Sequence, residues 1–142
     1  MQISHADLDG AVLWTLIRAA TQVKRDLGAV FLAHELSPVQ FGVLANLTAE
    51  PEMTTADLAR KVLTRPQSLA GVLDGMVERG LVARAPDRGR GRRNAITVTA
   101  TGDELLTRVW PDFLAANDLT GHDIDPERQA ELNRLLTTLL PH

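Results

Sequence analysis

The strongest constraint on the fold of this 142-residue chain is a pair of helix-start signals ten residues apart, in the stretch TTADLARKVLTRPQSLAG. Thr54 or Thr55 can cap a first helix, in which apolar residues recur at a spacing of four. Thr64 can cap a second helix, because Gln67 completes a Thr-x-x-Gln capping box and Gly80 supplies a stop signal. The sequence therefore predicts two short helices joined by a tight turn, which is a helix-turn-helix unit. The second helix is expected to bury Leu69, Val72, Leu73 and Met76.

Two segments with an alternating pattern follow this unit. LVARA, residues 81–85, and AITVT, residues 95–99, alternate apolar with polar or small residues, which is typical of half-buried strands. Pro86 ends the first segment, so we expect the two to pair as a hairpin, a wing beside the helix-turn-helix unit. The tip of this wing is DRGRGRRN, residues 87–94, which holds four arginines.

Amphipathic helices are predicted on both sides of these elements, because apolar residues recur there at steps of three and four. The first of them is expected to bend or to make a close contact at Gly28. The apolar stripes of the terminal helices exceed what a small lobe can cover, so self-association is the expected way to bury them. The predicted order is a helix over 7–35, a helix over 38–48, a polar loop over 49–53, the helix-turn-helix unit, the wing, a helix over 102–119 and a last helix from 126 onward.

Charge is distributed unevenly along the chain. Residues 60–93 carry nine basic and three acidic side chains, a net charge of +6, whereas the other 108 residues carry a net charge of −9. A basic segment within an acidic chain is typical of a local face that attracts phosphates. A solvated basic surface is the alternative interpretation of the same pattern.

Residue content argues against several classes of protein and site. The chain has no cysteine, which excludes disulfides and thiolate metal sites. No apolar run approaches the roughly 20 residues of a membrane span, and the N-terminus lacks a signal-peptide pattern, so a cytoplasmic protein is expected. The four histidines are scattered, and the sequence contains no catalytic motif or phosphate loop. We therefore expect no enzyme activity, no cofactor and no metal site.

Four stretches of the chain resemble the MarR family of bacterial transcriptional regulators. They are LSPVQFGVLANL, TTADLARKV, PQSLAGVLDGMVERGLVAR and ITVTATG, and the likeness extends over about residues 36–106. The resemblance implies a mainly α fold with a small β-hairpin wing, in which terminal helices form a homodimer. A two-fold dimer would place its recognition helices about 34 Å apart and read a pseudo-palindromic operator in double-stranded DNA. The implied single domain over 1–142 has residues 36–101 as a winged helix-turn-helix DNA-binding lobe and residues 1–35 and 102–142 as a dimerisation region.

The first candidate DNA contacts lie on the second helix of the helix-turn-helix unit. Its buried positions leave Arg65, Gln67, Ser68 and Gly71 facing outward near the N-terminus. Arginine, glutamine and serine carry the donors and acceptors that read base edges and phosphates. Gln67 has an alternative role in the capping box, and Gly71 is expected to allow close approach of DNA or of the preceding helix. Thr55 is a further candidate, since the first helix can hold a phosphate at its N-terminus; simple capping is the alternative.

The wing supplies the second set of candidate DNA contacts, Arg88, Arg90, Arg92 and Arg93. The resemblance implies that the wing lies over the minor groove beside the recognition helix. MarR family members carry an Asp-Arg-Arg-like motif before the second strand, whereas this chain has Arg90-Gly91-Arg92 there. The acidic residue that braces the wing is missing, so the arginine that enters the groove is left open.

The sequence thus predicts a DNA-binding transcriptional regulator, specifically a homodimeric repressor relieved by a small aromatic ligand. Two alternatives from other classes stay open. One is a helical protein-interaction module whose winged helix does not read DNA specifically, and the other is a small enzyme. An RNA-binding arginine-glycine tract is disfavoured, because the tract is short and lacks neighbouring aromatic side chains.

Overall fold

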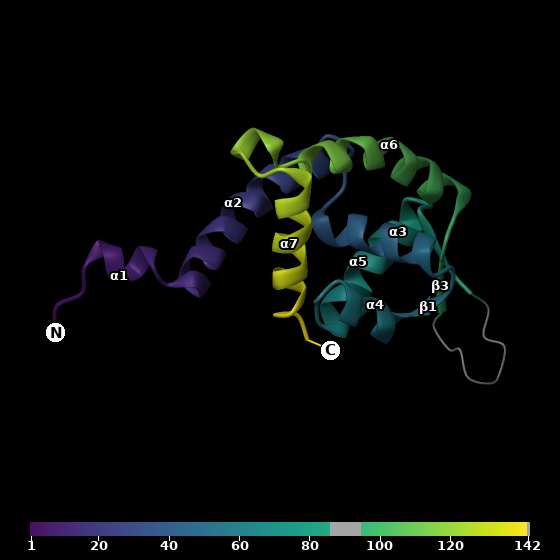
Figure 1. The fold of residues 1–142 in the computed structure, drawn as a ribbon. Helices are drawn as coiled ribbons and strands as arrows, with labels where there is room; N and C mark the ends of the chain where they lie inside the picture. The colour runs from purple at the N-terminus through teal and green to yellow at the C-terminus, as the bar shows by residue number, and fades with distance from the viewer. Residues whose placement is uncertain (86–94, 142) are drawn as a thin grey trace.

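The chain folds mainly into α-helices, with a small antiparallel sheet at one edge of the helical lobe (Figure 1). The computed structural model describes residues 1–85 and 95–141. The predicted fold class, mainly α with a small β-hairpin, is confirmed. The elements in chain order are α1 (His5–Asp9), α2 (Val12–Leu32), α3 (Pro38–Ala49), β1 (Met53–Thr54), α4 (Thr55–Lys61), α5 (Pro66–Glu78), β2 (Val82–Arg84), β3 (Ala95–Val98), α6 (Ala100–Ala116), the short 3-10 helix η1 (Thr120–His122) and α7 (Pro126–Thr137).

A hydrophobic core joins α3, α4, α5, the sheet, the first half of α6 and the end of α2. On α5, the predicted inward residues Leu69, Leu73 and Met76 are fully buried, and Val72 is partly buried. Ile96 of β3 is fully buried in the same cluster. Burial of one large aliphatic side chain contributes about 1.5–3 kcal/mol. This core therefore holds α4 and α5 at a fixed angle and leaves their outer faces in solvent.

The sheet has three strands in the order β1-β3-β2. β2 and β3 pair as the predicted hairpin, with Val82 opposite Val98. The prediction of a loop over 49–53 is wrong at its end, because Met53 is buried and pairs with Ile96. A two-residue strand is too short to carry an alternating pattern, and only its distant partner reveals it. This pairing joins the start of α4 to the root of the hairpin.

The single helix predicted over 7–35 is in fact two helices, α1 and α2, separated by Gly10 and Ala11. α1 begins at a capping box, in which Ser4 and Asp7 each accept a hydrogen bond from the other's backbone N–H, and it ends at Gly10. α2 continues through Gly28 without interruption, and a Cβ there would meet no atom of the described chain within 4 Å. The close contact predicted for Gly28 is therefore wrong within one subunit.

Three α-helices end in the same way, with one residue in the left-handed region of backbone space. These residues are Glu35 after α2, Leu63 after α4 and Gly80 after α5, with φ of 57°, 53° and 72°. The stop predicted at Gly80 is confirmed. In each case the N–H of the next residue bonds to a carbonyl five positions earlier, which is the Schellman motif. The bonds run from Leu36 to Phe31, from Thr64 to Ala59 and from Leu81 to Met76, each at 3.0 Å.

The last two helices begin at capping side chains, and α6 ends sooner than predicted. Thr99 caps α6 by accepting a bond from the Gly102 N–H at 3.1 Å, and Asp125 caps α7. α6 ends at Ala116 rather than at residue 119. α7 ends at Thr137, so Leu139 and Leu140 lie beyond the helix.

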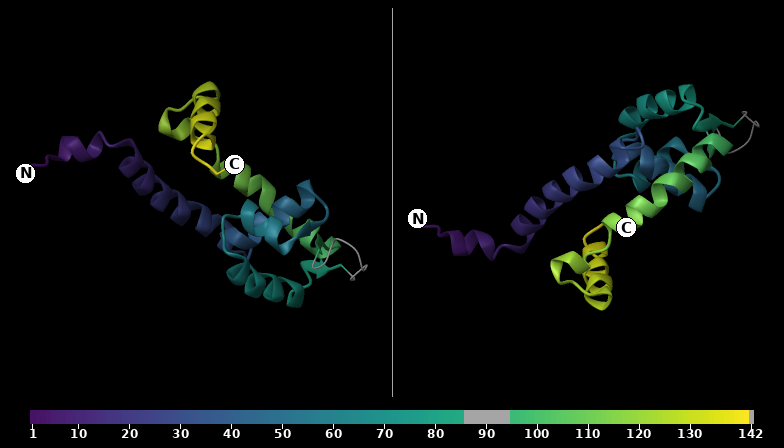
Figure 2. Two further views of the ribbon diagram at one scale, coloured as in Figure 1. Left: turned by 90° about the horizontal axis from the view of Figure 1, so that it is seen from below. Right: turned by 90° about the horizontal axis from the view of Figure 1, so that it is seen from above.

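The terminal helices extend away from this core (Figure 2). α1 and α7 have no buried residue, and the buried residue of α2 is Phe31 at its far end. In the part of the chain that the structure describes, no helix is both long and apolar enough to cross a membrane. The large apolar side chains that α1, α2 and α7 expose are Leu8, Val12, Leu13, Trp14, Ile17, Val23, Leu32, Leu132, Leu135 and Leu136.

Candidate nucleic-acid interface

The turn between α4 and α5 determines how α5, the candidate recognition helix, is presented. Leu63 closes α4 in the left-handed conformation, and the Thr64 N–H bonds to the Ala59 carbonyl. α3 packs closely against this turn, because a Cβ on Gly42 would lie 2.9 Å from Cγ1 of Val62. Glycine at this position allows the close approach. With its inner face held by the core, α5 therefore presents its first turn at the surface.

The capping box predicted for Thr64 and Gln67 does not form. Thr64 belongs to the motif that ends α4, so the N-cap of α5 is Arg65, whose side chain makes no capping bond. Gln67 and Ser68 are exposed in the first turn, and neither side chain has a hydrogen-bond partner among the described residues. Their amide and hydroxyl groups are thus available to a ligand.

Gly71 lies one turn further along the exposed side of α5. A Cβ at this position would meet nothing within 4 Å in the described chain, so the predicted close contact with the preceding helix is wrong. Glycine inside a helix costs up to about 1 kcal/mol relative to alanine. The packing around Gly71 in the described chain does not offset that cost, and the predicted approach of DNA at this position stays a prediction.

Thr54, and not Thr55, caps α4. Its Oγ1 accepts a bond from the Asp57 N–H at 3.1 Å. Hydrogen bonding to Thr54, with a smaller contribution from the Arg60 guanidinium, holds the pKa of Asp57 below its ordinary value. Arg60 is therefore paired on its own helix. The Thr55 hydroxyl has no partner among the described residues and stays available for a phosphate.

An ion pair joins the root of the wing to α5. Nη2 of Arg84 on β2 lies 2.5 Å from Oδ1 of Asp74 on α5. Sequence reasoning missed this pair, because neither residue stands in a motif and only the packed fold brings them together. The pair is exposed to solvent, so it adds a contact between β2 and α5 that is worth at most about 1 kcal/mol. The predicted wing contacts Arg88, Arg90, Arg92 and Arg93 lie outside the described residues.

A second link ties the wing to α6. The Thr99 hydroxyl donates to the Gly80 carbonyl at 2.5 Å and accepts from the Gly102 N–H at 3.1 Å. A Cβ on Gly102 would lie only 2.1 Å from the Leu81 carbonyl oxygen. The Thr-x-x-Gly spacing thus joins the end of α5, the wing and α6 in one rigid junction.

An aromatic cluster fills the space where α2, α3 and α6 meet. Phe41 stacks on Phe31 at a ring separation of 4.5 Å and contacts Phe113 at 4.6 Å, and Trp110 lies 5.1 Å from Phe113. Next to this cluster, a mainly apolar cavity of about 460 Å³ opens between α3 and α6. We call it the α3–α6 cavity. It is lined by Ala45, Thr48, Ala49, Asp103, Leu106, Thr107, Trp110 and Pro111.

Comparison with known proteins agrees with this geometry. A family model described as MarR family matches residues 34–93, which cover the helix-turn-helix unit and most of the wing. The HTH-type transcriptional repressor Rv2887 of Mycobacterium tuberculosis is 28% identical over 131 residues, which are 92% of this chain and 94% of the repressor. The chain is therefore similar to the MarR family of transcriptional regulators, most clearly over its helix-turn-helix unit.

Solved structures of MarR proteins share the fold along the whole chain. A MarR family regulator from Silicibacter pomeroyi superposes with a TM-score of 0.76 at 25% identity, covering 100% of this chain and 99% of that one. The Mycobacterium tuberculosis protein Rv2887 in complex with DNA superposes with a TM-score of 0.71 at 26% identity, covering 89% and 94% of the two chains. Rv2887 has also been solved in complex with salicylic acid, with a TM-score of 0.70 at 28% identity, covering 89% and 93%.

Proposed function

We propose that this protein is a homodimeric repressor of the MarR type that reads a pseudo-palindromic DNA operator and is released by a small aromatic ligand. The observation that carries the proposal is the first turn of α5. Arg65, Gln67 and Ser68 are exposed there, and the described chain offers their side chains no competing bond. Side chains of these types at the start of a helix are those that read the major groove.

Each polar side chain has a distinct role in the proposed complex. The Gln67 amide presents a donor and an acceptor, which fit the edge of an adenine. Arg65 reads a guanine or a phosphate, and Ser68 bonds to a base or a phosphate. Thr55 holds a phosphate at the start of α4. The wing arginines Arg88, Arg90, Arg92 and Arg93 add charge at the neighbouring minor groove.

Dimerisation is proposed for the terminal helices. Residues 1–35 and 102–142 form the dimerisation region, and residues 36–101 form the DNA-binding lobe. The exposed apolar side chains of α2 and α7 support this division, because a monomer would leave them in water. A two-fold dimer presents two copies of α5 to successive turns of the duplex.

The α3–α6 cavity is the proposed effector site. Its apolar lining and the neighbouring ring of Trp110 suit a small aromatic compound. The cavity lies between the helix-turn-helix lobe and α6, so a ligand there can favour a dimer whose recognition helices no longer match the operator. The complexes of Rv2887 with salicylic acid and p-aminosalicylic acid support aromatic acids as first candidates.

The test is a selection of bound duplexes from a random pool, followed by fluorescence anisotropy at two salt concentrations. We expect enrichment of a pseudo-palindrome and loss of sequence preference in Gln67→Ala. Arg65→Ala should weaken binding by about tenfold, since a hydrogen bond to a charged group is worth about 1.5–3 kcal/mol. Arg25→Ala is the matched control, because Arg25 lies outside the helix-turn-helix unit and forms no ion pair or hydrogen bond among the described residues. Failure to enrich any sequence over random duplex would reject the proposal.

The effector step has its own readout. Salicylate should lower operator affinity in the wild type, and filling the cavity with Ala45→Phe should remove that response while leaving the sequence preference unchanged. An equal response in both proteins would place the ligand elsewhere.

A further inference from the structure

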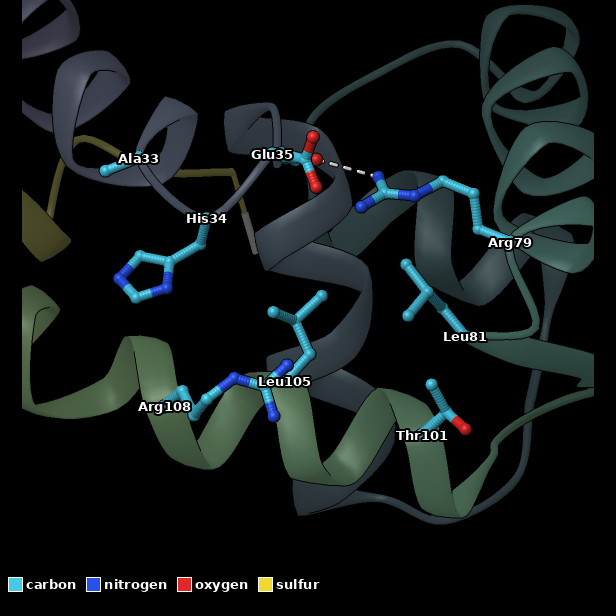
Figure 3. Close-up of a pocket in the computed structure, with 8 residues that line it drawn as sticks. All are labelled: Ala33, His34, Glu35, Arg79, Leu81, Thr101, Leu105 and Arg108. Atoms are coloured by element: carbon cyan, nitrogen blue, oxygen red, sulfur yellow. Dashed lines mark hydrogen bonds between the residues drawn. The ribbon is translucent and has the colours of Figure 1, made fainter.

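A second cavity lies on the other side of α6 from the α3–α6 cavity. Figure 3 shows the residues that line it. Its volume is about 610 Å³, and its walls are the turn after α2, the end of α5 with the start of β2, and one side of α6. α6 contributes Thr101, Leu105 and Arg108 to this cavity, whereas Asp103, Leu106, Thr107, Trp110 and Pro111 line the other. At 100° per residue these two sets face opposite directions. We call the second space the arginine cavity.

Two arginines of the arginine cavity have no carboxylate partner within residues 1–85 and 95–141. Nη1 of Arg79 donates to the backbone carbonyl of Glu35 at 2.7 Å, a neutral acceptor. Arg108 has no ion pair or hydrogen bond to any described residue through its guanidinium. Four other arginines have acids beside them, in the pairs Arg18–Asp9, Arg60–Asp57, Arg84–Asp74 and Arg134–Glu131, whereas Arg25, Arg65 and Arg128 form no ion pair among the described residues.

The other polar groups of the cavity form no ion pair with these two arginines among the described residues. His34 uses Nε2 to bond Asp112 at 2.7 Å, so that carboxylate is already engaged. Glu35 is the acidic side chain of the lining, and it is exposed and forms no ion pair among the described residues. Leu81 and Leu105 lie between the two arginines in the close-up (Figure 3). Both arginine side chains are exposed, so their guanidinium groups are accessible to an anion from solvent.

We propose that the arginine cavity binds a small anion with several oxygen atoms, a phosphate or a polycarboxylate. Guanidinium groups offer paired N–H donors whose spacing matches two oxygens of such an anion. Arg108 is free to bind in this way, and Arg79 keeps donors that its bond to Glu35 does not use. The cavity is separate from the proposed effector site in both place and chemistry.

Binding of an anion there would act on the recognition helix through Arg79. This residue is the C-cap of α5, and its bond to the Glu35 carbonyl ties α5 to the end of α2. An anion that draws the Arg79 guanidinium toward Arg108 competes with that tie. The consequence for operator binding rests on the proposed function, whereas binding of the anion itself does not.

The direct test is a titration of the full-length protein followed by heteronuclear NMR. The probes are inorganic phosphate and citrate, each at constant ionic strength, so that the two arms separate the phosphate from the polycarboxylate. Saturable shifts should gather at residues 33–35, 79–81 and 101–108. Arg108→Gln should weaken binding about tenfold, because it removes a charged bidentate donor. Glu35→Gln should tighten binding, because it removes the neighbouring negative charge.

Three results would overturn the site: no saturable shift with either probe, unchanged affinity in both variants, or shifts centred on the α3–α6 cavity. Coupling to DNA is measured separately, by anisotropy on the selected operator with and without the anion that binds. The anion should change operator affinity in the wild type and not in Arg108→Gln. Equal effects in the two proteins would reject the coupling while leaving the site intact, since salt weakens DNA binding generally.

Discussion

Gly102 shows how one residue of the Thr-x-x-Gly segment determines the position of the wing. The space that a side chain would need is occupied by the Leu81 carbonyl oxygen, 2.1 Å from an ideal Cβ. That carbonyl also accepts the Thr99 N–H at 3.1 Å, so it cannot move without breaking the junction. The Leu81 carbonyl, at the end of α5 and the start of the wing, therefore contacts both Thr99 and Gly102.

We predict that Gly102→Ala lowers the free energy of unfolding by about 3 kcal/mol, because the added methyl group overpacks a rigid backbone contact. Gly28→Ala is the matched control: a Cβ there is unobstructed, so helix propensity should raise stability slightly. Urea denaturation followed by circular dichroism measures both variants. Equal stability of Gly102→Ala and the wild type would contradict the contact.

At the start of α4, we predict that the pKa of Asp57 depends on its hydrogen bonding with Thr54. Hydrogen bonding with Thr54 lowers the pKa of Asp57 in the folded protein. A lowered carboxyl pKa stabilises the fold above the unfolded value near 4, and this contribution is lost as pH falls through the folded pKa. Thr54→Ala should therefore raise the Asp57 pKa toward 3.8, as measured by carbon-detected NMR titration. Thr48→Ala, whose hydroxyl bonds the Leu44 carbonyl, should leave that pKa unchanged.

At the element scale, the sequence predicted α3, α4, α5 and the hairpin because each has a strong local signal. The error at Thr64 is instructive. Thr64 and Gln67 have the spacing of a capping box, but the Thr64 N–H already closes α4 through its bond to Ala59. Thr64 can either end α4 or cap α5, and its place in the Schellman motif of α4 excludes the cap of α5. The spacing of residues in the sequence does not show which of the two roles Thr64 takes.

Features that depend on distant partners were not predicted. β1 exists because Met53 pairs with Ile96, and the Asp74–Arg84 pair requires the hairpin to fold back on α5. Both cavities likewise combine side chains from elements far apart in the chain. The outward residues Arg65, Gln67 and Ser68 were predictable, because the buried stripe of α5 determines which positions remain. Their contacts with DNA, and those of the wing arginines, stay predictions.

On α5, we predict that one substitution at Gly71 raises the stability of the fold and lowers operator affinity. Gly71→Ala should raise the free energy of unfolding by about 0.5–1 kcal/mol, because alanine is the better helix former and its methyl group meets no described atom. The same methyl group should weaken operator binding about tenfold, if the helix backbone approaches the duplex closely at this point. Gly28→Ala should give the stability gain without the loss of affinity. A more stable variant with unchanged affinity would exclude close approach at Gly71.

At the scale of the whole molecule, the terminal helices are hard to explain in a monomer. α7 has no buried residue, yet Leu132, Leu135 and Leu136 share one side of it. α2 exposes a similar stripe along most of its length, and Figure 2 shows both helices projecting from the core. Apolar surface of this extent is typical of an obligate dimer interface, in which both subunits contribute the same face.

We predict that Leu132→Glu with Leu136→Glu converts the dimer to a monomer, because each charge would have to be buried without a partner. The lobe should stay folded, since α7 contributes no buried residue to the core. Operator affinity should fall by about a hundredfold or more, because one recognition helix then binds without the other. Light scattering coupled to gel filtration measures the mass, circular dichroism the fold, and anisotropy the affinity.

The control for this variant adds the same charge to the opposite face of α7. Ala130 and Thr137 lie about 160° and 140° around the helix from Leu132, at 100° per residue. Ala130→Glu with Thr137→Glu should therefore leave both the dimer and operator binding in place. Dissociation by both double variants would mean that net charge, and not the leucine stripe, governs assembly. A wild-type monomer at micromolar concentration would remove the physical basis for a two-fold operator, because a single α5 can contact only one half-site.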